Sequence, residues 1–198
     1  MLGYKMKIHV REDMGETKIM EQLDHEKIYI KLVCIEDAED LFQATSDSIH
    51  VLRKFPASLP WSLHTPSLES SIRYCQQYIT DAKAGVAFTY IVRLSSSADF
   101  VGVIGLHQIQ WDIRCVTIGF WANRIFHGQG YMTTALQLIS QTLKESFAIK
   151  RIEALVDLEN ESAKQLCLRT GFKLEEILEK SAKSPVDGSI RDIAIFVK

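Results

Sequence analysis

The chain has 198 residues, of which 46% are hydrophobic and 24% are charged, and its formal net charge is −2. This composition is ordinary for a globular domain with a full core, and it offers no basic block that would neutralise nucleic-acid phosphates. Its apolar runs are too short to cross a membrane, and charges come too early for a signal peptide. The sequence therefore predicts a cytoplasmic protein with no membrane or direct nucleic-acid partner.

The cysteines and histidines are dispersed along the chain. Cys34, Cys75, Cys115 and Cys167 lie far apart, and no CxxC or HExxH spacing is present. Metal sites need their ligands at characteristic short spacings, whereas isolated cysteines in a chain of this size are mostly buried thiols. We therefore expect reduced core thiols and no metal centre.

The first part of the chain begins with residues 1–25, which are polar and have no clear period. They are predicted to be either a mobile arm or an extra first element, ahead of a single domain over residues 26–198. This arm could also contribute to a homodimer, although nothing in it demands one. The domain is then expected to continue with a strand at 27–33, a helix at 34–46, a proline-rich loop at 55–66 and a helix at 67–85 closed by Gly85.

From residue 86 onward the pattern favours strands. The segments 87–94 and 100–109 predict an antiparallel pair, and 115–123 predicts a strand with alternating faces. An amphipathic helix follows, with apolar residues at helical spacing: Met132, Ala135, Leu136, Ile139, Leu143 and Phe147. The chain is expected to end with a strand at 151–158, a short helix to Gly171 and a hairpin turning at Asp187-Gly188. The predicted fold class is mixed α+β.

The stretch "HGQGYMTTAL" (127–136) places Gly128 and Gly130 directly before the amphipathic helix. Glycines ahead of a helix let an anion approach the free N–H groups of the first turn, where the helix dipole also attracts it. No lysine follows as a P-loop requires, and Thr133 stands where a dinucleotide fingerprint needs a third glycine. An ordinary strand–helix turn is the alternative interpretation.

A longer series of motifs resembles the GNAT superfamily of acetyl-CoA-dependent N-acetyltransferases. The segments "IGFW", "GQGYM", "RIEA", "NES" and "TGF" occur in order within residues 27–197, with "LPW" at 59–61. Within the superfamily, the chain is most similar to the Rim-type branch that acetylates ribosomal-protein N-termini. The resemblance implies the GNAT fold: a twisted, mostly antiparallel sheet with a central parallel strand pair that splays apart, flanked by helices.

The resemblance also implies a site for acetyl-CoA. Backbone amides at 127–133 would hold the pyrophosphate, from the residues His127, Gly128, Gln129, Gly130, Tyr131, Met132 and Thr133. Pantetheine would lie in the gap of the splayed strands, along Ile118, Phe120 and Trp121, where an unpaired N–H could polarise the thioester carbonyl. Ile125 stands where the family often has Arg or Gln. Because backbone groups make most of the contacts with the cofactor, this difference is not expected to remove binding.

The "NES" motif implies catalytic positions. Asn160 would bind cofactor or order water, and Ser162 would protonate the departing thiolate. Both also suit a structural role, because Asn160 or Ser162 could cap the following helix and Ser162 with Gln165 forms a capping-box pattern. Many relatives use a tyrosine where Cys167 stands here, which favours Ser162 as the acid and a packing role for Cys167.

The general base is open at the level of sequence. Some relatives in the Rim-type branch use an acid near the position of Ser181, and Glu179, two residues earlier, shares its face of a strand. His107, Asp112 and His64 are other candidates, each of which more commonly has an ordinary surface or packing role. Direct attack of the amine with water as the proton acceptor is a further alternative.

The acceptor side is predicted to include Trp61, His64, His107 and Trp111, although Trp61 and Trp111 could instead be packing residues. The favoured reaction is acetyl transfer to a protein N-terminal α-amine, of a ribosomal protein among others, in a ternary complex. A small-molecule acceptor such as a polyamine, an antibiotic or a peptide-like toxin is the first alternative. A non-catalytic module that binds acyl-CoA or a partner is the second.

Overall fold

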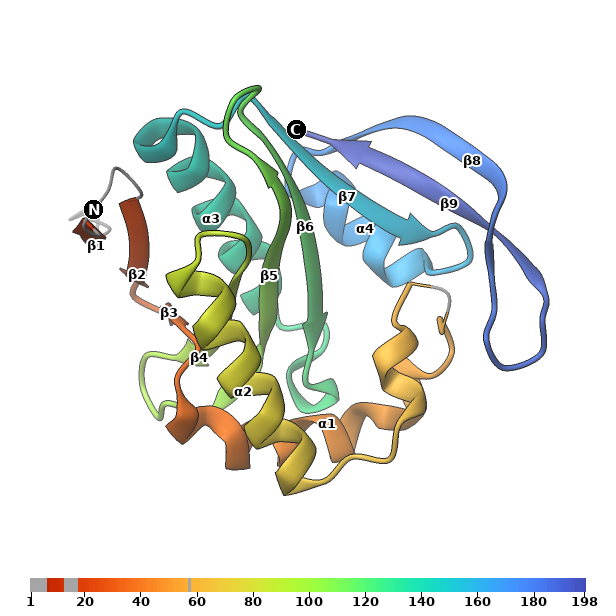
Figure 1. Cartoon of the computed structure of the whole chain (residues 1–198), viewed down its shortest axis with the longest axis horizontal. Helices are drawn as coiled ribbons and strands as arrows, with labels where there is room; N and C mark the ends of the chain where they lie inside the picture. Colours follow the sequence, from red (N-terminus) through yellow and green to blue (C-terminus); the bar gives the residue numbers. More distant parts are fainter. Residues whose placement is uncertain (1–6, 13–17, 57) are drawn as a thin grey trace.

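The computed structural model describes residues 7–12, 18–56 and 58–198. These residues form one mixed sheet of nine strands in the order β1-β2-β3-β4-β5-β6-β7-β9-β8, with four α-helices (Figure 1). Among them, no helix is long and apolar enough to cross a membrane. The predicted mixed α+β class and the GNAT-type sheet are confirmed.

The element bounds follow the predicted order. The strands are β1 (Lys7–Glu12), β2 (Lys18–Asp24), β3 (Ile28–Leu32), β4 (Phe88–Leu94), β5 (Phe100–Gln110), β6 (Cys115–Ala122), β7 (Arg151–Asp157), β8 (Lys173–Lys183) and β9 (Ile190–Val197). The helices are α1 (Ala38–Leu52), α2 (Leu68–Lys83), α3 (Tyr131–Phe147) and α4 (Glu161–Arg169). Short 3₁₀ turns are η1 (Ile35–Asp37), η2 (Pro60–Leu63) and η3 (Arg124–Phe126).

Two segments differ from the sequence prediction in extent. The sequence pattern ends the first helix near residue 46, but α1 continues to Leu52 because Leu52 is buried in the same core cluster as Leu41 and Ala44. The proline-rich loop contains the η2 turn, with Pro60 in its first position. Of the N-terminal segment, the described residues form β1 and β2, which pair antiparallel and extend the sheet beyond β3.

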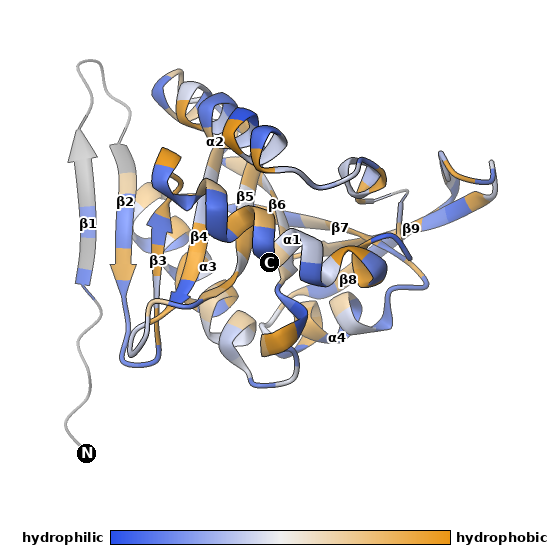
Figure 2. Cartoon of the chain, turned by 90° about the horizontal axis from the view of Figure 1, so that it is seen from below, coloured by the Kyte–Doolittle hydropathy of each residue, from blue (hydrophilic) through white to orange (hydrophobic). Residues whose placement is uncertain are grey.

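Helices cover both faces of the sheet. Figure 2 shows α2 above the sheet and α3 and α4 below it. The two faces carry separate cores, since Ile118 packs in the α3 cluster whereas Trp121 packs in the cluster with residues of α1 and α2. The alternation predicted for 115–123 is therefore confirmed. The predicted apolar face of α3 is also buried, at Met132, Ala135, Leu136, Ile139 and Leu143.

Side chains of opposite charge meet where α1 starts beside β3 and β4. Asp37 is 1% exposed, and its carboxylate accepts hydrogen bonds from Lys31 Nζ at 2.7 Å and Arg93 Nη2 at 2.8 Å. It also accepts from the backbone N–H of Cys34 at 2.8 Å. Arg93 reaches Asp40 at 2.7 Å on the surface. This ionic cluster ties α1 to the two strands beneath it.

Candidate functional site

The parallel pairing of β6 and β7 ends halfway along the strands. The register joins Cys115, Val116 and Thr117 to residues 151–153, and no β6 residue after Thr117 is paired with β7. Figure 1 shows the two strands adjacent at their beginnings and diverging toward their ends. The predicted splayed pair is confirmed, and it leaves the β7-side edge of β6 open from Ile118 onward.

Backbone groups alternate between the two edges of a strand. Asn123 donates its N–H to Val101 on β5 at 2.8 Å, and β5 and β6 keep an unbroken register from Gly102↔Ala122 to His107↔Thr117. Trp121 therefore also directs its backbone groups to β5, whereas Ile118 and Phe120 direct theirs into the gap. Of the three residues predicted along pantetheine, Ile118 and Phe120 have free backbone groups there and Trp121 does not.

The second part of the site is the N-terminus of α3. In the described part of the chain, the N–H groups of residues 128–133 have no hydrogen-bond partner, and the first bonded amide is Thr134, which donates to Gly130 O at 3.0 Å. Gly128 and Gly130 have φ of +75° and +82°, a backbone region that residues with a side chain rarely adopt. A Cβ on either would meet nothing within 4 Å. Six consecutive N–H donors at this helix N-terminus are thus without a partner in the described structure, and the space beside Gly128 and Gly130 is open.

The side chains of His127 and Gln129 hold this loop in place, and the backbone N–H of His127 is not one of the free donors. The N–H of His127 already donates to Arg124 O at 3.2 Å, so the predicted amide donor at 127 is occupied. Its ring nitrogen lies 3.1 Å from the carbonyl oxygen of Ala122, and Gln129 Nε2 donates to Ile125 O at 3.0 Å. These contacts hold the loop against the end of β6, where the open strand edge lies.

The turn from β7 into α4 is held by a buried ion pair. Asp157 is 1% exposed, and Arg191 of β9 donates to both of its carboxylate oxygens at 3.0 and 3.1 Å. The carboxylate also accepts from the N–H of Glu159, and the Asp157 carbonyl accepts from the N–H of Asn160. Arg191 occurs in the "GSIRD" segment, but sequence spacing alone offers no reason to pair it with Asp157.

Asn160 is the N-cap of α4, with its Oδ1 accepting from the N–H of Ala163 at 3.1 Å. Its capping role is thus observed, and a cofactor role stays a prediction. Ser162 lies inside the first turn and is exposed, so the predicted Ser162–Gln165 capping box is wrong; Gln165 instead donates to Glu161 at 2.8 Å. Freed from capping, the Ser162 hydroxyl is available to other partners. Cys167 is fully buried, as expected of a packing thiol.

Glu179 lies in β8, beside an irregularity in the pairing with β9. It is exposed, and β9 separates β8 from β7. Two strand spacings, or about 10 Å, thus lie between Glu179 and β7, and the gap lies on the opposite side of β7. The described structure does not bring Glu179 together with the other predicted residues.

A cavity of about 510 Å³ opens on the α1/α2 face. Trp61 and His64 line it together, and Trp61 lies against Trp121 with ring centroids 5.8 Å apart. Arg53 holds the η2 segment in place by donating to the carbonyls of Ser62 at 2.9 Å and His64 at 3.3 Å. The polar lining consists mainly of hydroxyls, with one cation, Arg73, and no carboxylate: Thr45, Thr65, Ser67, Ser70, Ser71 and Tyr74. Trp121, predicted for the cofactor, thus belongs with the residues predicted for the acceptor.

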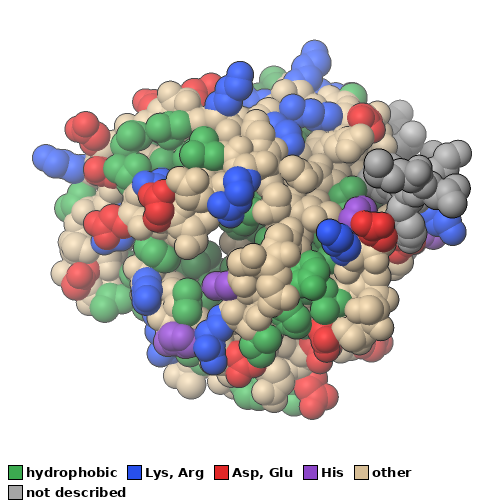
Figure 3. All heavy atoms as spheres, turned by 180° about the vertical axis from the view of Figure 1, so that it is seen from behind, with side chains coloured by type: hydrophobic (Ala, Val, Ile, Leu, Met, Phe, Trp, Pro, Cys, Tyr) green, Lys and Arg blue, Asp and Glu red, His purple; other side chains and the backbone are tan. Residues whose placement is uncertain are grey.

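The face opposite to the view of Figure 1 has a hollow near its middle, with acidic and basic side chains interspersed around it (Figure 3). This mixed charge agrees with the low net charge of −2. Nowhere in the described residues do three His, Cys, Asp or Glu side chains gather as a metal site would need.

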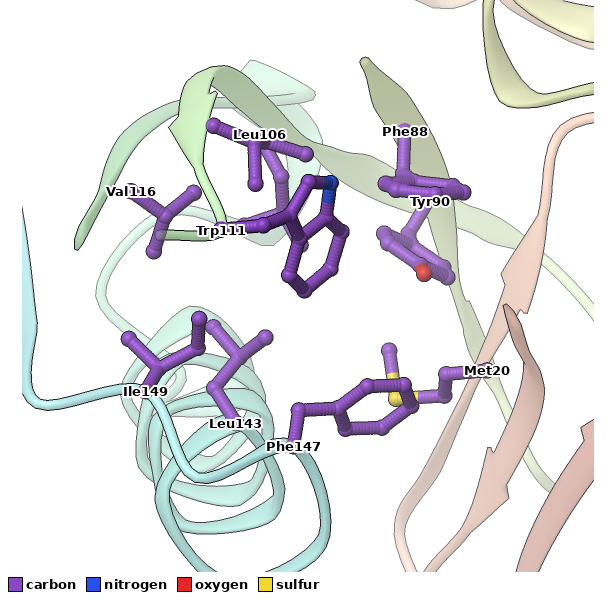
Figure 4. Close-up of a pocket in the computed structure, with 10 residues that line it drawn as sticks. Met20, Phe88, Tyr90, Leu106, Trp111, Val116, Leu143, Phe147 and Ile149 are labelled. Carbon is purple, nitrogen blue, oxygen red and sulfur yellow. The ribbon is translucent and has the colours of Figure 1, made fainter. Parts of the chain in front are cut away.

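Trp111 does not line the cavity on the α1/α2 face. It lies in the β5–β6 turn, at the opposite end of β6 from the gap, and its indole points into a small internal cavity of about 20 Å³ (Figure 4). Phe88, Tyr90 and Leu143 line the same cavity, and the indole N–H donates to Gly85 O at 3.4 Å. These surroundings favour the packing alternative for Trp111.

Replacing Trp111 by leucine should therefore lower the free energy of unfolding by about 2 kcal/mol, because buried aromatic surface is lost next to an existing cavity. Acetyl-CoA affinity should stay unchanged. Urea denaturation and calorimetric titration of the same variant check both expectations. A selective loss of transfer to an acceptor, without loss of stability, would return Trp111 to the acceptor site.

Comparison with known families identifies the chain. The sequence pattern of the family described as "Acetyltransferase (GNAT) domain" matches residues 27–173, most of the chain. The chain belongs to the GNAT acetyltransferase family. It is accordingly an acyltransferase, and acetyl-CoA is its acetyl donor.

Individual relatives agree with this assignment. The ribosomal-protein-serine acetyltransferase of Escherichia coli K12 is 26% identical over 124 residues, which cover 63% of this chain and 68% of the relative. Among solved structures, a microcin C7 self-immunity acetyltransferase in complex with acetyl-CoA and AMP has a TM-score of 0.80 at 23% identity, with 88% and 93% of the chains covered. A ribosomal L7/L12 α-N-protein acetyltransferase in complex with coenzyme A has a TM-score of 0.79 at 20% identity, with 88% and 94% covered. The resemblance to the Rim-type branch is confirmed.

The observed geometry fits acetyl-CoA. A pyrophosphate needs converging N–H donors and space free of side chains, which residues 128–133 offer. An extended pantetheine arm needs unpaired strand backbone, which the open edge of β6 offers at Ile118 and Phe120. The two features are adjacent along the chain, separated by the η3 turn.

Proposed function

We propose that this protein transfers the acetyl group of acetyl-CoA to a primary amine, with a peptide N-terminal α-amine as the favoured acceptor. The observation that carries the cofactor part is the row of six unpartnered amides at residues 128–133 beside the open edge of β6. The acetyl group would lie at the gap, with the amine approaching from the cavity on the α1/α2 face.

In this reaction acetyl-CoA supplies an activated thioester carbonyl. The amides of residues 128–133 bind the pyrophosphate, and the N–H groups of Ile118 and Phe120 are positioned to orient the arm and to stabilise charge on the carbonyl oxygen. Ser162 donates a proton toward the departing sulfur, and Asn160 keeps the first turn of α4 in place. The Trp61–Trp121 pair keeps water from the amine and holds the acceptor near the gap.

The charge of the acceptor cavity supports a peptide rather than a polyamine. Its described lining contains Arg73 and His64 but no aspartate or glutamate. The lining therefore offers a polycation no free carboxylate, since the nearest acid along α2, Glu69, is paired with Arg73 at 2.5 Å. A peptide N-terminus carries a single amine, and its backbone and side chains can hydrogen-bond to the hydroxyls of the lining. The names of the relatives, which refer to ribosomal proteins, support the same class.

A small peptide-like toxin is the second candidate, favoured by the tilted Trp61–Trp121 pair, whose aromatic surface suits a compact ligand with a flat ring. A non-catalytic module that binds acyl-CoA would use the same open amides at residues 128–133, so only a transfer assay separates it from the enzyme. An assay of acetyl transfer to each class of acceptor distinguishes these candidates.

The testing experiment combines binding and transfer. Calorimetric titration with acetyl-CoA and desulfo-CoA should show binding of both in the micromolar range. The protein is then incubated with acetyl-CoA and one of two acceptors, either spermidine or a short peptide that begins with serine. The products are identified by mass spectrometry. Acetylation of the peptide α-amine in preference to spermidine supports the proposal; the reverse preference contradicts the acceptor class. Binding without transfer to any amine would favour the module.

Replacing Ser162 by alanine should lower kcat by about 100-fold while leaving the dissociation constant of acetyl-CoA unchanged, because only proton donation to the sulfur is lost. Stability should hardly change, since the side chain is exposed and caps nothing. Titration and steady-state rates check this, with Ser96→Ala in the β4–β5 turn as the matched control, because Ser96 is exposed as well. An unchanged kcat would show that solvent protonates the thiolate.

A further inference from the structure

His107 lies on β5 over the middle of the sheet, on the α1/α2 face. Gly105 on β5 and Gly119 on β6 are direct partners, and both lie next to its ring. A Cβ on Gly105 would collide with the imidazole, and one on Gly119 would lie 3.7 Å from Nε2. Two facing glycines therefore make room for an imidazole that lies over the strands.

The ring of His107 lies beside the point where the gap between β6 and β7 opens. Gly119 follows Ile118, the first residue of β6 beyond the parallel pairing. Nε2 thus lies within a few ångströms of the strand at the point where the gap opens, and on the face from which the acceptor cavity is reached. Trp121, two residues further along the same face, lines that cavity.

The surroundings of His107 favour the neutral form of its ring and leave the ring without a hydrogen-bond partner among the described residues. No described residue forms a hydrogen bond with the ring, and its aromatic neighbour is Tyr78 of α2, edge-on at 6.1 Å. Desolvation by burial lowers the pKa of His107, and the Asp81 carboxylate of α2 opposes this with a weaker effect. On the β7 side, the same face carries Glu153, which is engaged by Arg151 at 2.6 Å.

Tyr74 and Tyr78 connect the ring to the cavity. Tyr74 lines the cavity and packs against Tyr78 with centroids 4.4 Å apart, and Tyr78 in turn contacts His107. Both tyrosines lie on one face of α2, one turn apart. The imidazole therefore lies at the inner end of an aromatic wall that runs from the cavity toward the gap.

We infer that His107 is the general base of the transfer reaction and accepts a proton from the acceptor amine through Nε2. This inference rests on the proposed function. It assigns the proton-accepting role to a residue beside the gap, whereas Glu179, on β8, lies about two strand spacings beyond β7.

The step balances without a further reactant. The ammonium form of the acceptor gives one proton to His107, and the neutral amine nitrogen forms a C–N bond with the acetyl carbonyl carbon. The C–S bond breaks, and its electron pair leaves with the sulfur. The amide nitrogen loses its remaining extra proton to solvent, while the thiolate takes one from Ser162 or solvent. A neutral imidazole is required at the start, so the rate falls as pH drops and the ring becomes protonated.

The test uses His107→Gln with His50→Gln as its matched control, since His50 is an exposed residue of α1. Rates of acetylation of the serine-peptide are measured between pH 5 and 9. We expect about a 100-fold lower kcat for His107→Gln and an unchanged rate for His50→Gln. The acid limb of the wild-type profile, with an apparent pKa below that of an ordinary histidine, should vanish in His107→Gln. Acetyl-CoA affinity, measured by titration, should be the same in all three proteins.

Two further measurements separate a chemical role from a structural one. In His107→Ala, the space beside Gly105 and Gly119 should admit free imidazole, which should restore at least a tenth of the wild-type rate. NMR titration of the histidine Cε1–H signals should give His107 a pKa below its ordinary value, independently of any activity. Such rescue would not follow if His107 only supported packing.

The possible outcomes distinguish the inference from the proposed function. A wild-type protein that acetylates the peptide, with His107→Gln within threefold of it and an unchanged pH profile, overturns the inference alone. A folded His107→Ala protein that free imidazole does not rescue also overturns it, because the ring would then serve packing alone. If the wild-type protein acetylates no amine, the proposed function fails and the inference falls with it.

Discussion

Replacement of Gly128 and Gly130 together by valine will weaken acetyl-CoA binding by at least about 100-fold, equivalent to about 2.7 kcal/mol. The added Cβ atoms meet no protein atom within 4 Å, so they enter the open space in front of the unpartnered amides. A pyrophosphate could no longer approach those N–H groups. Calorimetric titration with acetyl-CoA and with desulfo-CoA measures the loss, which should be equal for the two ligands because the thioester does not take part.

This experiment must separate the backbone strain that valine introduces from its steric obstruction of the cofactor. Valine at positive φ costs on the order of 1–3 kcal/mol at each position wherever it is placed. Gly188, with φ of +71° in the β8–β9 turn, gives a matched control, since Gly188→Val introduces similar strain far from α3. It should lower the melting temperature but keep full affinity. Full affinity in the double variant would show that the α3 amides do not hold the cofactor.

The elements that form the candidate cofactor site could be predicted from the sequence because they are built from local patterns. The amphipathic period of 132–147 determines α3, and two glycines before it determine where the helix starts. The alternation in 115–123 likewise indicates which β6 side chains face α3. Even the splay of β6 and β7 could be expected, although by resemblance and not by any physical property of the two strands.

The contacts around the candidate acceptor cavity could not be predicted from the sequence, because they join distant segments. Trp61 and Trp121 are sixty residues apart, and no local period relates them. The place of Trp121 in β6 suggested the cofactor for the same reason, whereas its side chain lines the cavity. His107 was one histidine among several candidates until pairing brought Gly105 and Gly119 beneath it. Ser162 suited a cap by spacing, but Asn160 occupies that position.

The ionic cluster at Asp37 is a further non-local feature, and its removal should have the largest effect on stability. Asp37→Asn should lower the free energy of unfolding by about 3–5 kcal/mol, because Lys31 and Arg93 then lose the carboxylate that compensates their partly buried charges. Asp40→Asn is the matched control: its carboxylate is half exposed and binds the same Arg93, so about 1 kcal/mol or less is expected. Urea denaturation at pH 7 measures both.

The pH dependence of this difference identifies its origin. Burial acts to raise the pKa of Asp37, but the hydrogen bonds from Lys31, Arg93 and the Cys34 N–H outweigh it, so the pKa is lowered on folding. A lowered carboxyl pKa contributes stability that is present above the unfolded value of about 4 and is lost as pH falls through the folded value. The difference in the free energy of unfolding between wild type and Asp37→Asn should therefore have its full size at pH 6 and become smaller below pH 4.

A difference that stayed constant down to pH 3 would mean that the asparagine variant fails through packing and that the charge of Asp37 contributes little. A narrowing difference has a consequence for the acceptor side, because the cluster joins α1 to β3 and β4. The charge of Asp37 would then hold α1, and with it Leu41 and Thr45, in place along the wall of the acceptor cavity.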